Sequence, residues 1–266
     1  MVEKLNNLSG KEWLQYSFSI WRDIIKTNGE RKLNHPASFP TQLTSRLIQI
    51  YTKEKGEIVL DPFLGSGSTV VSAYMLGKKG IGFELSKEYV KLAKERIKDI
   101  QLNLTQTKKD LIKPEIYDKT IFDILKFLSE NSVDLVITSP PYWDILTEKR
   151  SADRKEIRKY SSSKEDLGNI HDYNEFMDKL KEAFVGIYKV LKKDKYCIVV
   201  VMDIRKKSKL YPLHIDLINK MKKIGFELDD IVIWDRQKEY NNMRPLGYPS
   251  VFRVNKVHEF ILIFKK

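Results

Sequence analysis

Short apolar segments alternate with longer amphipathic ones over most of the sequence, and this alternation restricts the fold more than any other feature. The apolar segments have the length of buried strands and span 57–61, 80–84, 133–138 and 196–202. The amphipathic segments have helical periodicity and span 68–76, 86–102, 173–191 and 212–224. Strands that alternate with helices form parallel sheets that are covered on both faces. The sequence therefore predicts an α/β fold built on a mostly parallel sheet.

Both ends of the chain add to this pattern. Ser9 opens a Ser-x-x-Glu capping box, so we expect a helix to start there, and residues 43–50 have the period of a second helix. Residues 228–234 and 258–264 are strand-like with no helical segment between them, which predicts an antiparallel hairpin at a sheet edge. No repeat or linker divides the 266 residues, so we expect one domain over 1–266.

Charge and composition narrow the function classes. Forty-eight Lys and Arg against 36 Asp and Glu give a net charge of +12, which attracts polyanions such as nucleic acid. A single cysteine, Cys197, excludes an internal disulfide and fits a reducing cytoplasm. The four histidines have no ligand spacing, so we expect no metal. We expect neither a signal peptide nor a membrane span.

A glycine-rich turn follows the first predicted strand and precedes a helix. Gly65 and Gly67 allow a tight turn and a close approach of the backbone to a ligand, and the helix N-terminus carries a partial positive charge. Glu84 ends the next strand, where a carboxylate can accept hydrogen bonds from two ribose hydroxyls. These features indicate an adenosine-containing cofactor, without separating NAD from S-adenosylmethionine. If the cofactor occupies this turn, Gly67→Val should fill the space that it needs.

A second motif, Ser139-Pro140-Pro141-Tyr142, follows the strand 133–138 and so lies at the carboxyl edge of the predicted sheet, where open α/β folds bind ligands. Two prolines fix the backbone and leave rigid carbonyl acceptors. Hydrogen bonds from a nucleobase amino group to Ser139 Oγ and the Pro140 carbonyl would free the nitrogen lone pair to attack a methyl sulfonium. Tyr142 would stack on the base, so we expect Tyr142→Phe and Tyr142→Trp to be tolerated.

These segments resemble the motifs of the DNA amino-methyltransferases. Residues 60–69 are similar to their motif I, residues 139–142 to motif IV, and residues 35–40 to the stretch of motif X that precedes motif I. The likeness extends to His258-Glu259 and covers nearly the whole chain. It implies a Rossmann-like fold with a mostly parallel seven-stranded sheet, an antiparallel C-terminal hairpin, and S-adenosylmethionine as cofactor.

The resemblance also implies a set of site residues. Those around the cofactor would be Phe39, Pro40, Asp61, Phe63, Gly65, Ser66, Gly67, Ser68 and Glu84. Those around the flipped base would be Ser139, Pro140, Pro141 and Tyr142.

The expected target is the N4 amino group of cytosine, because Ser139 stands where the N6-adenine enzymes usually carry Asp or Asn. N6-adenine methylation is the alternative. The acidic residue that should read the cofactor's adenine is replaced by Thr120, and Asp118 or Asp123 could serve instead.

Target DNA would be read by two basic, irregular stretches, 144–171 and 235–257. The arginines expected to contact it are Arg150, Arg154, Arg158, Arg244 and Arg253. The expected partner is double-stranded DNA, with an associated restriction endonuclease possible. We expect a monomer or homodimer in the cytoplasm of a prokaryote, associated with the nucleoid.

Three other functions are weighed against this one. A cytosine-5 methyltransferase needs a cysteine nucleophile in a loop, but Cys197 lies in an apolar strand segment and is expected to fill the core. A Pro-Pro-Tyr loop can also hold the planar amide of RNA or protein substrates. An inactive DNA-binding subunit is the third alternative, against which the motif residues are all intact.

Overall fold

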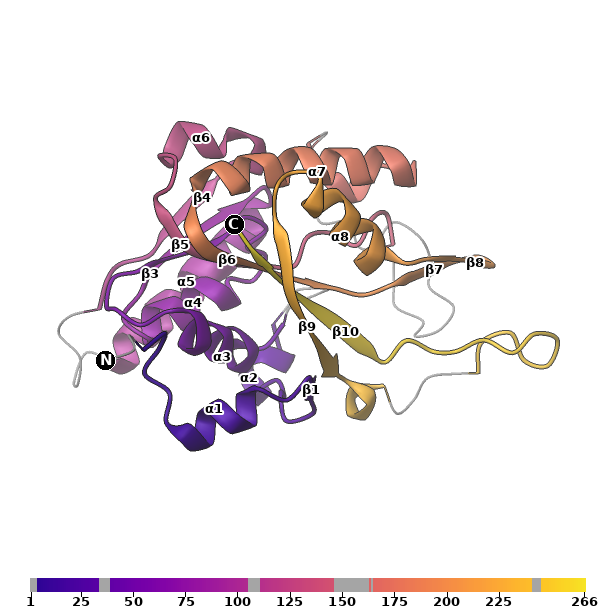
Figure 1. Ribbon diagram of the computed structural model, residues 1–266, viewed down its shortest axis with the longest axis horizontal. Helices are drawn as coiled ribbons and strands as arrows, with labels where there is room; N and C mark the ends of the chain where they lie inside the picture. The colour runs from indigo at the N-terminus through magenta and orange to yellow at the C-terminus, as the bar shows by residue number, and fades with distance from the viewer. Residues whose placement is uncertain (1–3, 34–38, 105–110, 146–162, 164, 241–244) are drawn as a thin grey trace.

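The fold is built on one large twisted sheet with helices on both faces (Figure 1). The computed structural model describes residues 4–33, 39–104, 111–145, 163, 165–240 and 245–266. Within these residues the main sheet has eight strands in the order β1-β9-β10-β6-β5-β2-β3-β4. They span Ile20–Trp21 (β1), Ile58–Asp61 (β2), Lys79–Glu84 (β3), Glu115–Asp118 (β4), Val133–Thr138 (β5), Leu191–Val201 (β6), Glu227–Asp235 (β9) and His258–Lys265 (β10). A separate two-stranded hairpin is formed by Ile204–Lys206 (β7) and Lys209–Tyr211 (β8).

Eight α-helices lie within the described residues. They span Gly10–Tyr16 (α1), Asn28–Arg31 (α2), Thr41–Tyr51 (α3), Ser68–Met75 (α4), Lys87–Leu104 (α5), Ile124–Phe127 (α6), Tyr173–Val190 (α7) and Leu213–Lys222 (α8). Short 3-10 turns cover Ile121–Asp123, Leu167–Asn169 and Gln237–Glu239. The Ser9 capping box predicted from the sequence is present at the start of α1. None of the described helices is long and apolar enough to cross a membrane.

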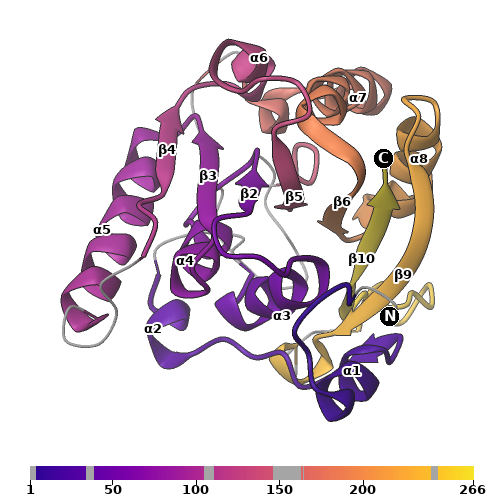
Figure 2. The same cartoon turned by 60° about the vertical axis from the view of Figure 1, so that its left-hand side comes forward.

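One strand, β10, runs opposite to the other strands of the main sheet. Strands β6, β5, β2, β3 and β4 are parallel to one another, and β10 is antiparallel to both β6 and β9. Figure 2 shows the parallel strands fanning out beside the β9–β10 pair. Since β10 begins where the parallel strands end, its first residues lie at their carboxyl edge. That edge also receives the turn after β2 and the segment after β5.

Alternate side chains of each strand pack on opposite faces of the sheet. In β6, Cys197 and Val199 join a core cluster with α7 and α8, whereas Ile198 and Val200 join a second cluster with α3. Cys197 is fully buried, and burial raises the pKa of its thiol well above the ordinary value. The expectation that this cysteine fills the core is confirmed.

The α/β fold with antiparallel C-terminal strands agrees with the sequence prediction, but two details of the sheet differ. The main sheet has eight strands in the described residues rather than seven, because β1 pairs with β9 in parallel. The β9–β10 hairpin is therefore not the edge of the sheet. The two residues of β1 are too few to show a strand period, and the four of β4 are only partly buried. The β7–β8 hairpin was also missed.

Candidate active site

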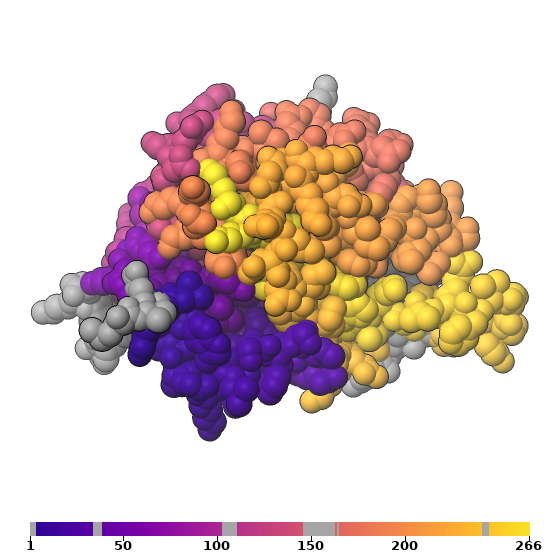
Figure 3. Space-filling view, in the orientation of Figure 1, coloured from indigo at the N-terminus to yellow at the C-terminus, as the bar shows by residue number. Residues whose placement is uncertain are grey.

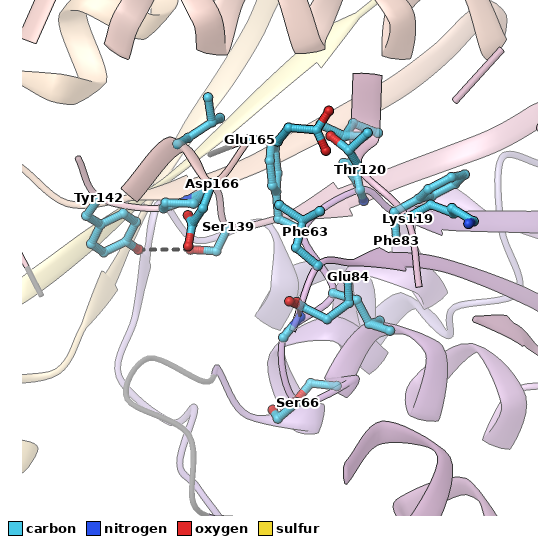
Figure 4. Close-up of a pocket in the computed structure, with 18 of the residues that line it drawn as sticks. Phe63, Ser66, Phe83, Glu84, Lys119, Thr120, Ser139, Tyr142, Glu165 and Asp166 are labelled. Atoms are coloured by element: carbon cyan, nitrogen blue, oxygen red, sulfur yellow. Dashed lines mark hydrogen bonds between the residues drawn. The ribbon is translucent and has the colours of Figure 1, made fainter. Parts of the chain in front are cut away.

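A pocket opens at the carboxyl edge of the parallel strands (Figure 4). It is walled by the turn after β2, the end of β3, the segment after β4 and the segment after β5. The lining residues are Phe39, Pro62, Phe63, Leu64, Gly65, Ser66, Ser68, Phe83, Glu84, Leu85, Lys119, Thr120, Ile121, Ser139, Pro141, Tyr142, Glu165, Asp166 and Leu167.

The glycine turn and Glu84 form one unit. Gly65 and Gly67 have φ of 52° and 84°, the left-handed region in which glycine costs no steric strain. Gly65 N donates to Glu84 Oε2 over 2.8 Å, and Ser86 N donates to Glu84 Oε1 over 2.7 Å. Each carboxylate oxygen thus has one backbone donor and keeps a further acceptor position. The turn therefore aims Glu84 into the pocket, as Figure 4 shows.

The environment of Glu84 is unusual for a carboxylate. Burial raises its pKa to about 7, against the lowering effect of the two backbone donors, and the nearby Asp166 and Asp61 raise it further. A ligand that donates hydrogen bonds to this carboxylate favours its charged form. The site therefore suits a ligand that brings hydrogen-bond donors to Glu84.

Asp61 lies beneath the turn and does not line the pocket. It is fully buried and accepts hydrogen bonds from Thr69 Oγ1 and Thr138 Oγ1, both over 2.7 Å, and from Phe63 N over 3.2 Å. Burial raises its pKa to about 6. Its contacts join the end of β2, the first turn of α4 and the end of β5. Asp61 therefore holds the two motifs together rather than facing a ligand.

Gly67 also lies behind the pocket. A Cβ at this position would be 2.7 Å from Ala93 Cβ and 3.2 Å from Ala93 Cα of α5. The expected effect of Gly67→Val thus has a different cause from the one inferred from the sequence. The substituent would disturb the packing of α4 on α5 and would strain a positive φ, instead of filling the cofactor's space.

Arg96 of α5 fixes the turn from outside. Its Nη1 donates to Ser66 O over 2.6 Å, and Ser68 Oγ donates to Phe39 O over 2.8 Å. The Phe39 ring is thereby held at the pocket from a segment that precedes α3. Sequence reasoning had no signal for Arg96, because a lone arginine in an amphipathic helix is normally a solvated side chain.

The wall opposite Glu84 is formed by the segment after β5. Ser139 Oγ donates to Tyr142 Oη over 3.1 Å, shown as a dashed line in Figure 4, and Tyr142 Oη donates to Glu259 Oε2 over 2.8 Å. Burial and the Glu259 carboxylate raise the pKa of the Tyr142 hydroxyl well above its ordinary value, so it stays protonated. Glu259 is 5% exposed and belongs to β10.

Most of the predicted pocket residues line one cavity, and four do not. Pro40, Asp61, Gly67 and Pro140 are absent from the lining. The segment after β4 contributes Lys119 and Thr120, whereas Asp118 and Asp123 do not line the pocket. The acidic side chains missed by sequence reasoning are Glu165 and Asp166, which reach the pocket from a segment far along the chain.

The lining fits the chemistry of S-adenosylmethionine. Glu84 offers acceptors for a ribose diol, and Phe39, Phe63 and Phe83 offer apolar surface for a planar base. The first N–H groups of a helix such as α4 have no partner within the helix, and its N-terminus carries a partial positive charge, which suits a carboxylate. In the described part of the chain, no three His, Cys, Asp or Glu side chains are grouped as metal ligands would be. The absence of a metal stays a prediction.

Of the predicted DNA contacts, only Arg253 can be located. Arg150, Arg154, Arg158 and Arg244 lie outside the described residues. Arg253 Nη1 donates to Ser208 O over 2.9 Å, so this arginine ties the segment before β10 to the tip of the β7–β8 hairpin. In Figure 3 the yellow segment projects from the right-hand side of the molecule.

The β7–β8 hairpin is a basic element that sequence reasoning missed. Lys207 and Lys209 are exposed at its turn. On the neighbouring segment, Tyr248 and Phe252 are 80% and 93% exposed. The run of basic residues in 205–209 was the available signal. The hairpin follows the carboxyl end of β6, and the bond from Arg253 to Ser208 joins the two elements.

Comparisons with known proteins agree with this geometry. A model of the DNA methylase family of N6 and N4 methyltransferases matches residues 3–95 and 133–266. The chain is 47% identical over 98 residues to the type II methyltransferase M2.DpnII of Streptococcus pneumoniae, covering 36% of this chain and 34% of that protein. It is 43% identical over 89 residues to the orphan methyltransferase M.BamHII of Bacillus amyloliquefaciens, covering 31% and 32%. These matches span about a third of each relative's length.

Among solved structures, TrmN from Thermus thermophilus has a TM-score of 0.53 at 14% identity, covering 87% of this chain and 50% of that one. This likeness confirms the fold class alone. The family match covers most of the chain and confirms both the resemblance found in the motifs and the predicted cofactor. The chain therefore belongs to the DNA methylase family of S-adenosylmethionine-dependent N6/N4 methyltransferases.

Proposed function

We propose that this protein methylates DNA at the N4 amino group of a cytosine flipped out of the duplex. The observation that carries the proposal is the shared pocket. Glu84 and the glycine turn line one side of it, and Ser139, Pro141 and Tyr142 line another. A methyl donor held by the first set would face an amino group held by the second. Such proximity is the main requirement of a direct transfer.

The proposed roles of the base-side residues follow from their hydrogen-bonding capacity. Ser139 Oγ and the Pro140 carbonyl would each accept one hydrogen of the target amino group. Two acceptors so placed would draw the nitrogen toward tetrahedral geometry and expose its lone pair. Bound S-adenosylmethionine supplies a methyl group on a positively charged sulfur. Tyr142 would cover one face of the flipped base.

The choice of cytosine rests on Ser139, which stands where the N6-adenine enzymes usually carry Asp or Asn. A serine hydroxyl and a proline carbonyl could also hold the adenine N6 amino group, so N6-adenine methylation is the second candidate. The family includes both activities. Cytosine-5 methylation is disfavoured because Cys197 is buried in β6, away from the pocket lining.

Duplex DNA is the proposed substrate because the β7–β8 hairpin and the segment before β10 expose basic and aromatic groups. Lys207 and Lys209 could contact phosphates, and Tyr248 and Phe252 present apolar rings next to them. The stretches 144–171 and 235–257 stay the predicted sequence readers. An associated endonuclease, the oligomeric state and a cytoplasmic location also stay predictions, as does an undivided domain over 1–266.

Nucleoside analysis tests the proposal. Purified protein, S-adenosylmethionine and bacterial genomic DNA are incubated together, and the DNA is digested to nucleosides for mass spectrometry. N4-methylcytosine is the expected product. N6-methyladenine would establish the second candidate, and 5-methylcytosine would overturn the mechanism. Methylation of RNA or protein alone, in parallel reactions, would exclude DNA as the substrate. No product on any substrate would favour an inactive DNA-binding subunit.

A further inference from the structure

A partly buried chain of hydrogen bonds leads away from Ser139. Ser139 donates to Tyr142, Tyr142 donates to Glu259 Oε2, and the Arg236 guanidinium donates to Glu259 Oε1. Arg236 is held in turn by Glu239, with 2.7 Å between Nη2 and Oε2, and its guanidinium lies over the Trp234 ring. The chain thus begins at the pocket and ends at an anchored cation on the segment that joins β9 to β10.

The Glu259 carboxylate determines which hydroxyl donates and which accepts in each of these hydrogen bonds. A carboxylate only accepts hydrogen bonds, and Glu259 Oε2 at 2.8 Å is a closer and charged acceptor than Val200 O at 3.4 Å, so Tyr142 uses its one hydrogen toward Glu259. Tyr142 Oη is then an acceptor for Ser139, whose own hydrogen is used in that bond. The lone pairs of Ser139 Oγ that stay available are the ones an amino group of a target base needs.

We propose that Glu259, fixed by Arg236, is a positioning residue that keeps the Ser139 hydroxyl in its acceptor orientation. The inference rests on the proposed function, since it explains how a serine can act as a hydrogen-bond acceptor for an amino group. Without the carboxylate, Tyr142 could donate to Ser139, and the Ser139 hydrogen would then point at the hydrogens of the base. Glu259 acts through Tyr142 and has no contact with the base.

This role changes the expectation for Tyr142→Phe. If Tyr142 only stacked on the base, phenylalanine would be tolerated, as the sequence alone suggested. Because its hydroxyl joins Ser139 to Glu259, Tyr142→Phe should lower kcat by about tenfold, the effect of losing one hydrogen bond in the transition state. Glu259→Gln should have a similar effect, since its amide can donate to Tyr142 and reverse the chain.

The test is a set of single-turnover rates at saturating DNA and S-adenosylmethionine, on Ser139→Ala, Tyr142→Phe, Glu259→Gln and the double variants. If Glu259 acts only through Tyr142, the double variant Tyr142→Phe/Glu259→Gln should be no slower than Tyr142→Phe alone. Tyr142→Phe should likewise add nothing to Ser139→Ala. Cofactor affinity should be unchanged throughout.

A matched control is available in the same chain. Tyr173 Oη donates to Asp216 Oδ2 over 2.7 Å, the same kind of bond away from the pocket lining. Tyr173→Phe should lower the melting temperature without changing the rate. If Glu259→Gln does not fold, the Ser139→Ala/Tyr142→Phe pair still tests the chain, because Tyr142→Phe removes one oxygen and keeps the ring.

The outcomes separate the two proposals. Full activity in Ser139→Ala would overturn the proposed base site itself. A slow Ser139→Ala with a normal Tyr142→Phe would overturn only the role of the hydrogen-bond chain. Rate losses that multiply in the double variants would show that Glu259 and Tyr142 act separately, which also contradicts the inference.

Discussion

The two sides of the pocket are held by contacts between residues at very different separations in the sequence. On the side proposed to hold the cofactor, Glu84 accepts hydrogen bonds from Gly65 N and Ser86 N, which are 19 and 2 residues away in the sequence. On the base side, Tyr142 is bonded to Glu259, 117 residues away. The first side is a local structure of two strands and their turns. The second depends on a strand that runs against the direction of its neighbours, so the two sides should respond separately to substitution.

Ser139→Ala should have the largest effect on turnover while leaving cofactor affinity unchanged. Loss of an acceptor that acts in the transition state should cost about 3 kcal/mol, or roughly a hundredfold in turnover, while S-adenosylmethionine affinity is retained. Steady-state rates and calorimetric titration measure the two quantities. Ser132→Ala is a control at the other end of β5, where the hydroxyl donates to Ser129 O and should not affect turnover. A parallel loss of cofactor affinity in Ser139→Ala would contradict the separation.

Glu84→Ala should weaken cofactor binding and leave turnover at saturating cofactor largely unchanged. Removing the acceptor for the ribose diol should weaken S-adenosylmethionine binding by about 1–3 kcal/mol, as for other charge-assisted hydrogen bonds. Turnover at saturating cofactor should fall much less. Glu115→Ala on the neighbouring strand β4 provides the control, since Glu115 does not line the pocket. Unchanged affinity in Glu84→Ala would remove this residue from the cofactor site.

The pH dependence of cofactor binding should sharpen the assignment of Glu84. Because burial raises its pKa to about 7, Glu84 is mostly protonated at pH 6 and mostly charged at pH 8 in the free protein. The diol donates to the charged form, so affinity should rise with pH by about tenfold over this range. Titration at several pH values measures it, and Glu84→Gln should flatten the profile. A profile that persists in Glu84→Gln would assign the effect to Asp61, whose pKa burial raises to about 6.

The smallest expected effect is on the salt dependence of DNA binding, through the exposed lysines of the β7–β8 hairpin. Lys207→Gln and Lys209→Gln should each lower the slope of log affinity for DNA against log salt by roughly one unit. Fluorescence anisotropy with duplex DNA at several salt concentrations gives the slope. Lys94→Gln and Lys98→Gln, exposed on α5, are controls of equal charge change. Equal slopes in all four variants would show that the β7–β8 hairpin does not contact phosphates.

The difference in sequence separation between the contacts on the two sides also explains which features could be predicted from the sequence. The turn after β2 and the position of Glu84 follow from strand ends and glycines within one βαβ unit, and the cavity includes both Gly65 and Glu84. The role of Glu259 could not be read in this way. A glutamate at the start of a strand is normally exposed, and only the insertion of β10 between β6 and β9 brings it to Tyr142.

Other misses have local physical causes. Strand β1 has two residues, so its pairing with β9 has no period to detect. Asp61 was assigned to the cofactor from the motif resemblance, but it is fully buried and its hydrogen bonds go to Thr69, Thr138 and the Phe63 backbone rather than into the pocket. In both cases the partner lies far away in the sequence and is found only in the three-dimensional structure.

The antiparallel placement of β10 has a consequence for the order in which the molecule assembles. Contacts between residues close in sequence form at a lower cost in chain entropy than those between distant residues. The turn that holds Glu84 can therefore close before the β9–β10 hairpin docks on β6 and presents Glu259 to Tyr142. A chain stopped between these steps would recruit the methyl donor but would lack an ordered acceptor site. Pulse-labelling hydrogen exchange during refolding should show β2 and β3 protected earlier than β10, so that the capacity to hold the donor precedes the capacity to use it.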